Sequence, residues 1–161
     1  MLLCLETIAL CLVFWVLCWL GTGSDQKNLK SFSAYPDEIQ RIVKADPILG
    51  LQVKTASPRV SFISNCVMFT ILLFPLGLTV KGTGFWQNFT HVLILGQVLN
   101  AFDFFVIDLV WFRHSPRTRF SATKSRPDLY LDPKNHCASF LRGIPCFLLV
   151  ALIDGILLSL F

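Results

Sequence analysis

The chain has 161 residues, of which 54% are hydrophobic and 15% charged, and its formal net charge is +4. The length fits one domain, while so apolar a composition excludes an ordinary soluble protein. A helix that crosses a bilayer core needs about 17 to 25 mostly apolar residues. Four segments satisfy this requirement, and they predict an all-α, integral membrane four-helix bundle as a single transmembrane domain: about 2–21, 60–80, 86–112 and 138–161.

The first apolar segment resembles a signal peptide, but no Lys or Arg precedes it and its apolar stretch is too long for a cleaved one. We therefore expect a retained helix. Its cysteines recur every seven residues, at Cys4, Cys11 and Cys18. No C-x-x-C pair or Cys/His cluster accompanies them, so we interpret the cysteines as packing residues and expect no metal and no cofactor.

The loops 22–59 and 113–137 lie on the same side of a four-span bundle, and they hold nearly all the basic residues. The opposite side has only Lys81. Because basic loops stay in the cytoplasm, both long loops are predicted to be cytoplasmic and both termini outside, in the plasma membrane. The basic residues of the two loops are Lys27, Lys30, Arg41, Lys44, Lys54, Arg59, Arg113, Arg117, Arg119, Lys124, Arg126 and Lys134.

These basic loops have two interpretations. The charges fix the topology and contact anionic headgroups, each contributing about 1 kcal/mol near the surface. Alternatively they bind a phosphate-bearing ligand, although the sequence RHSPRTRFSATKSR has no glycine-rich phosphate cradle. The residues predicted to contact phosphate or lipid are Arg113, Arg117 and Arg119.

The loops also contain local structure. In YPDEIQRIVKADP, Pro36 suits a first helical position, acidic residues follow, and Pro47 ends the run. Its three apolar residues, Ile39, Ile42 and Val43, form one narrow face, which predicts a short amphipathic helix on the membrane surface or, alternatively, a helix that binds a partner. The segment RPDLYLDPKNH is expected to fold back on the membrane surface.

One face of the third apolar segment is polar. At 100° per residue, a helix over 86–112 places four polar side chains within roughly 140°: Gln97, Asn100, Asp103 and Asp108. This seam must face protein or water, because a carboxylate at a helix centre costs about 2.5 to 3.5 kcal/mol on insertion scales. Asp103 falls near the bilayer midplane. It is either a protonatable site that serves function or a protonated acid that only forms a structural hydrogen bond.

Helix rise converts sequence position into depth. Asp108 and Arg142 fall at one level near the inner boundary, with Asn65, and we expect an ion pair there. This ion pair would act as an inner gate or, alternatively, would only lock the third and fourth helices together. Glu6, Asp154 and Gln97 are expected to form an outer layer that shares protons and hydrogen bonds. Alternatively, Glu6 is an interfacial anchor.

No nucleophile elbow, phosphate-binding loop, aspartate-rich repeat or paired metal-ligand histidine occurs. At the phrases KNLKSFSAYPDEIQ, FDFFVIDLVWFR and DPKNHCASFLRGI, the chain resembles a group of small uncharacterised bacterial membrane proteins, some of them labelled permeases. The resemblance covers most of the chain. It implies a four-helix membrane fold and brings no catalytic residue with it.

Three functions remain open. The first is a permease-like component that moves a proton, cation or small polar solute along the seam. The second is a membrane enzyme that acts on a lipid headgroup or polyprenyl phosphate at the cytoplasmic surface. His114 would be its acid or base, oriented by Asp108, and its phosphate clamps would be Arg117, Arg119 and Arg142. The third is a non-catalytic partner subunit. We expect contact with anionic lipid and a homo-oligomer or larger complex, and no nucleic acid.

Overall fold

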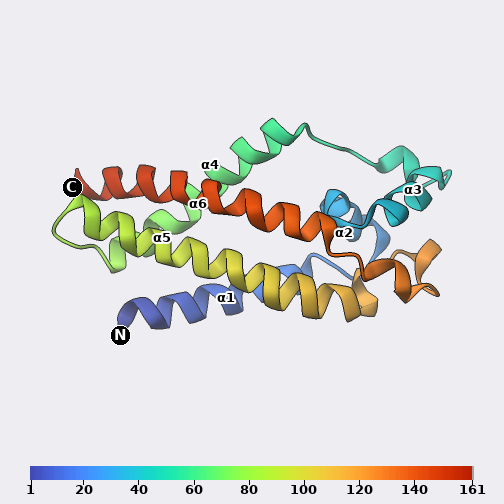
Figure 1. Cartoon of the computed structure of the whole chain (residues 1–161), viewed down its shortest axis with the longest axis horizontal. Coiled ribbons are helices and arrows are strands. Elements are labelled where there is room, and N and C mark those ends of the chain that lie inside the picture. The colour runs from blue at the N-terminus through green and yellow to red at the C-terminus, as the bar shows by residue number, and fades with distance from the viewer. Residues whose placement is uncertain (161) are drawn as a thin grey trace. The chain divides into compact units, whose positions relative to one another are not determined.

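The computed structural model describes residues 1–160 as helices and connecting turns, with no strand among them (Figure 1). Four long helical segments occur in this part of the chain: α1 (Leu2–Leu20), α4 (Pro58–Thr79), α5 (Phe85–Phe102) continued by η3 (Asp103–Phe112), and α6 (Lys134–Ser159). Each is long and apolar enough to cross a membrane. Because no strand occurs among residues 1–160, the predicted all-helical class is confirmed. Of the four predicted segments, only the last extends to Phe161, which lies outside the described residues.

Short helices fill the two long loops. The first loop contains α2 (Asp25–Asn28), η1 (Leu29–Ala34), α3 (Asp37–Ala45) and η2 (Gly50–Gln52). The second contains η4 (Pro116–Thr118), η5 (Ser121–Thr123) and η6 (Pro127–Tyr130). The chain forms two compact units: an apolar unit of residues 1–12, 56–102 and 140–160, and a polar unit of residues 13–55 and 103–139.

Small residues bring the helices of the apolar unit close together. A Cβ at Gly77 of α4 would meet Leu158 of α6 and Val92 of α5, and a Cβ at Gly143 of α6 would overlap the Asn100 carboxamide. Small residues at a helix interface allow such close backbone approach. The glycines therefore set the helix spacing in this unit.

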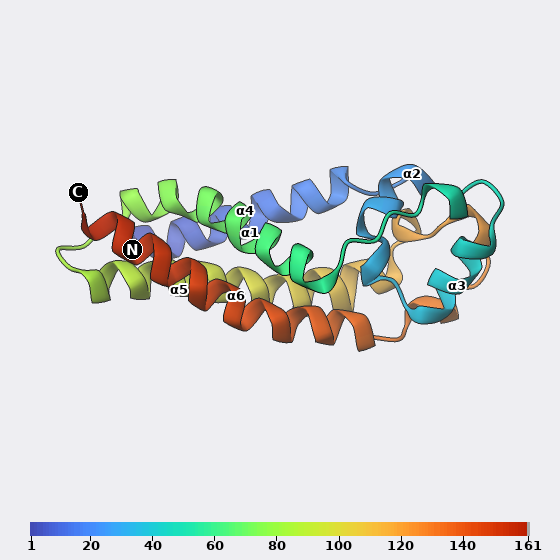
Figure 2. The same ribbon diagram turned by 90° about the horizontal axis from the view of Figure 1, so that it is seen from above.

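The polar unit has an aromatic core of its own. Segments from both long loops contribute to it, and Figure 2 shows the cyan first-loop and orange second-loop segments side by side. Its buried members are Phe32, Tyr35, Ile39, Val43, Leu49, Phe112, Phe120 and Tyr130. The Tyr35 hydroxyl donates a hydrogen bond to the Thr118 carbonyl at 2.7 Å, so the polar group of this buried side chain has a partner.

This core corrects two expectations. Helix α3 forms where it was predicted, but Ile39 and Val43 are 0% exposed within the core, so protein rather than a membrane surface covers its apolar face. Tyr130 of the segment RPDLYLDPKNH is also fully buried. Its hydroxyl accepts from the Phe120 backbone N–H at 2.9 Å, so the aromatic residue of this segment packs into the protein core.

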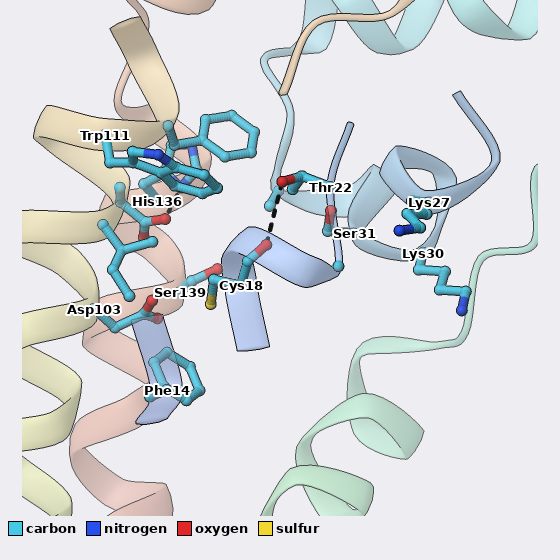
Figure 3. A pocket seen from close by; sticks show the side chains of 15 residues that line it. Phe14, Cys18, Thr22, Lys27, Lys30, Ser31, Asp103, Trp111, His136 and Ser139 are labelled. Carbon is cyan, nitrogen blue, oxygen red and sulfur yellow. Dashed lines mark hydrogen bonds and ion pairs between the residues drawn. The ribbon is translucent and has the colours of Figure 1, made fainter. Parts of the chain in front are cut away.

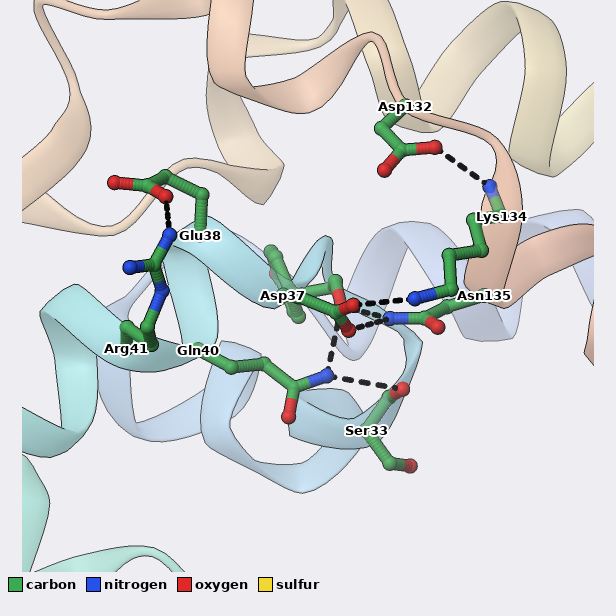
Figure 4. Close-up of polar contacts among 9 residues, drawn as sticks. Ser33, Asp37, Glu38, Gln40, Arg41, Asp132, Lys134 and Asn135 are labelled. Atoms are coloured by element: carbon green, nitrogen blue, oxygen red, sulfur yellow. Dashed lines mark hydrogen bonds and ion pairs between the residues drawn. The ribbon is translucent and has the colours of Figure 1, made fainter.

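An exposed ionic contact joins the start of α3 to the start of α6 (Figure 4). Lys134 Nζ donates to Asp37 Oδ2 at 2.6 Å, and Asn135 Nδ2 donates to Oδ1 at 3.2 Å. These hydrogen bonds, Lys134 first, hold the pKa of Asp37 below its usual value. Because the ionised form is favoured in the folded state, the contact stabilises the protein most when Asp37 is charged.

We predict that Gly143→Ala destabilises the protein by about 1–3 kcal/mol, since overpacking outweighs the better helix propensity of alanine. The new methyl group displaces the Asn100 side chain from α6. Thermal unfolding in detergent measures this change. The matched control is Gly84→Ala, because a Cβ there meets nothing within 4 Å. Equal unfolding temperatures for the two variants would contradict the packing described.

We predict a pH-dependent effect of Asp37→Asn. The folded pKa of Asp37 is lowered, so its stabilising contribution is complete above the unfolded pKa of about 3.9 and disappears as pH falls through the folded pKa. The wild type should unfold at a higher temperature than the variant at pH 6, and the difference should vanish in strong acid. A difference that grows with acidification would contradict the contact.

Candidate functional site

The polar stretch of the third long helix is wound as a π-helix over Asp103–Phe112. An α-helix would separate Asp103 and Asp108 by about 140° around the axis. The i→i+5 bonding of a π-helix instead places residues five apart on nearly one face, and such segments are frequent at functional sites. Asp103 and Asp108 are therefore aligned more closely than the α-helix predicted from the sequence would allow.

Asp108 pairs with His136 of α6. The His136 Nδ1–H donates to Asp108 Oδ1 at 2.9 Å, and the two side chains are 2% and 15% exposed. The Phe112 ring lies edge-on to the imidazole with centroids 4.8 Å apart. Nε2 of His136 is buried and has no hydrogen-bond partner among the described atoms. A neighbouring carboxylate that fixes one ring nitrogen prepares the other for proton exchange.

A cavity of about 390 Å³ adjoins this pair within the polar unit (Figure 3). Asp103 and Asp108 line it from η3, while His136 and Ser139 line it from successive turns of α6. Figure 3 shows Asp103 beside Ser139 and Cys18. Other lining residues are Phe14, Cys18, Thr22, Lys27, Lys30, Ser31 and Trp111. Its volume lies within the roughly 300–1,000 Å³ typical of small-molecule sites.

The next two seam residues along the helix serve the packing of the apolar unit. Gln97 Nε2 donates to the Ile144 carbonyl at 3.0 Å, and Asn100 Nδ2 donates to the Phe140 carbonyl at 3.2 Å. Both carbonyls belong to α6 and lie close to Pro145 in the sequence. These two carboxamides therefore join α5 to α6.

The outer layer is arranged differently from the prediction. Glu6 accepts a hydrogen bond from the Thr79 hydroxyl, and Asp154 is 0% exposed with neither carboxyl oxygen hydrogen-bonded. The hydrogen bonds predicted among Glu6, Asp154 and Gln97 are therefore not formed, because Glu6 and Gln97 have other partners. Asn65 is exposed on α4. Arg142 lies in the apolar unit, so its pairing with Asp108 stays a prediction.

The predicted phosphate-contacting arginines have structural contacts. Arg113 donates to the Leu131 carbonyl. Arg117 donates to the Trp19 and Thr22 carbonyls at 3.3 and 3.2 Å, and its guanidinium lies 4.1 Å from the Trp19 ring centroid. It thus binds the end of α1, whereas Arg119 is half-buried. Contact of these residues with phosphate or lipid stays a prediction.

His136 was missed in the sequence analysis, which considered His114 instead. His114 is exposed, and its Nδ1 lies 2.7 Å from the Val110 carbonyl of its own helix. The pair Asp132-Pro133 is a helix-start signal that could have located His136. Asp132 Oδ1 accepts a hydrogen bond from the Lys134 N–H at 3.0 Å and caps α6. This helix begins four residues before the predicted one. That earlier start brings His136 into the helix.

Among residues 1–160, no group of three or more His, Cys, Asp and Glu side chains is placed to hold a metal ion. Comparisons with protein-family models, curated proteins and solved structures gave no match. The candidate site therefore rests on the contacts, burial and cavity described above.

We predict energetic coupling between Asp108 and His136. Asp108→Asn and His136→Gln should each destabilise the protein, and the double variant should lose less than the sum, with a coupling of about 0.5–3 kcal/mol. Chemical unfolding of the four proteins in detergent measures this energy. Asp108→Asn combined with His114→Gln is the control and should be additive. Additivity in both pairs would rule out the Asp108–His136 contact.

Proposed function

We propose that this chain is an integral protein of the plasma membrane that transports a small polar solute or cation, linked to proton movement. The observation that carries this proposal is the cavity in which Asp103, Asp108 and His136 come together. Carboxyl and imidazole groups exchange protons, and ionisable residues in apolar helices commonly mark ion or substrate pathways. Asp103 and Asp108 would bind the solute, and His136 would exchange the proton.

The charge distribution gives the proposed orientation. The polar unit contains the basic residues of both long loops except Arg59, and the positive-inside rule assigns these loops to the cytoplasmic side with both termini outside. The cavity would then be open to solute from the cytoplasm. The Gln97 and Asn100 bonds to α6 would hold α5 against α6 until the helices rearrange. Four helices barely surround a path, so we propose that the chain works as a homo-oligomer or within a larger complex.

Proton flux tests this function. The purified chain is reconstituted into liposomes that contain a pH-sensitive dye, and a potassium gradient with valinomycin drives protons. We expect the wild type to accelerate the change of internal pH, because the acidic cavity accepts and releases protons. Asp103→Asn should reduce the rate to that of liposomes without protein.

The matched control is Asp132→Asn, which removes an exposed carboxylate of the same unit outside the cavity while an amide can still cap α6. It should keep the wild-type rate. Equal rates for Asp103→Asn and the wild type would contradict the proposal, provided that both proteins reconstitute to the same density.

A second candidate is a membrane enzyme that acts on a lipid headgroup. The buried His136–Asp108 pair favours it, because an oriented imidazole in a cavity that the Ser139 side chain also lines suits acid–base chemistry. Mass spectrometry of total lipid from cells that express the wild type or His136→Gln tests it. A lipid species that changes only with the wild type would support the enzyme, and identical lipid profiles would exclude it.

A further inference from the structure

The cavity carries opposite charges on different elements. Its acidic residues, Asp103 and Asp108, come from η3, and its basic residues come from α2 (Lys27) and η1 (Lys30). Figure 3 shows the two lysines on one side of the last turn of α1 and Asp103 with His136 on the other. The acidic and basic residues of the lining are therefore separated by the last turn of α1.

The acidic side has the chemistry of an ammonium site. Ionised carboxylates only accept hydrogen bonds, and an ammonium group supplies two or three donors. Phe14 and Trp111 both line the cavity, and Figure 3 shows Phe14 beside Asp103 and Trp111 beside His136. Aromatic faces attract ammonium groups through their quadrupoles, and carboxylates add direct charge pairing. An amine placed here contacts both types of group.

The basic side suits an anionic group. Lys27 and Lys30 are exposed at their side chains, and Lys27 Nζ uses one donor on the Leu20 carbonyl at 3.0 Å. Each ammonium has three donors, so both lysines can still bind a phosphate or carboxylate. A simple cation meets repulsion from these lysines, and a simple anion meets repulsion from the aspartates. A molecule with separated charges of both signs avoids both penalties.

We infer that the ligand of this cavity is a zwitterion, with an ammonium group at Asp103 and Asp108 and a phosphate or carboxylate group at Lys27 and Lys30. The inference deepens the proposed function and rests on it, because the same cavity would hold the transported solute. A soluble amino phosphate and the headgroup of an aminophospholipid share this chemistry.

Calorimetric titration of the full chain in phosphatidylglycerol nanodiscs tests the inference, with ethanolamine phosphate, ethanolamine and glycerol phosphate as probes. Ethanolamine phosphate should bind at least about tenfold tighter than either other probe, since each charge pair contributes separately. Asp103→Asn should weaken ethanolamine phosphate and ethanolamine alike. Lys30→Gln should weaken ethanolamine phosphate and glycerol phosphate but not ethanolamine, and Lys54→Gln, outside the cavity, should change none of the three.

A second titration separates the two sources of the zwitterion. Nanodiscs that contain phosphatidylethanolamine should block ethanolamine phosphate if the site takes the lipid headgroup, and should leave its binding unchanged if the site takes soluble ligands. Either result supports a zwitterion site.

Two results would overturn the inference: no binding of ethanolamine phosphate, or ethanolamine bound as tightly as its phosphate with Lys30→Gln ineffective. In the second case a cation site would remain, and the proposed transport function would stand. That function fails separately if Asp103→Asn leaves proton flux unchanged.

Discussion

The arrangement of the polar unit depends on how a carboxylate within an apolar helix is satisfied. Asp108 lies in the segment DFFVIDLVWF, whose other residues, apart from Asp103, are apolar. Its partner is the buried His136, in contact with the ring of Phe112, which is itself a member of the aromatic core. An unpaired charge at this position would cost several kcal/mol, so α6 and η3 must meet here. The cavity lies beside this contact because the pair brings polar groups from both helices together.

In the apolar unit, polar side chains on the helices are hydrogen-bonded in a different way. Its helices have few polar groups, and the carboxamides of Gln97 and Asn100 are satisfied by backbone carbonyls of α6 rather than by charges. Glycines at the contacts allow the required approach, as at Gly143. Hydrogen bonds of this kind fix helix position without creating a site. Helix packing therefore explains why Gln97 and Asn100 are polar, without a ligand at these two positions. The proposed ligand contacts are confined to the polar unit.

Much of the architecture could be predicted from local patterns. Long apolar runs specify helices of membrane-spanning length, and Pro36 with the acidic residues after it marks the start of α3. The contacts between distant segments could not be predicted. Nothing local indicates that Ile39 and Val43 face Tyr130 and Phe120 rather than lipid, because periodicity defines an apolar face but not what covers it. His136, the partner of Asp108, could not be predicted for two reasons. It is 28 positions away in the sequence, and the π-helix changes which side of η3 each residue occupies.

The accessibility of Cys18 tests most directly whether the cavity is a solute site. Cys18 lines the cavity, and Cys11, one heptad earlier on α1, is buried in the apolar unit. Two variants of the full chain, each retaining one of these cysteines, are reconstituted in nanodiscs and treated with a charged, membrane-impermeant thiol reagent at alkaline pH. Our account predicts rapid modification of Cys18 and none of Cys11. Two equally unreactive thiols would show that water does not reach the cavity and would contradict the proposed function.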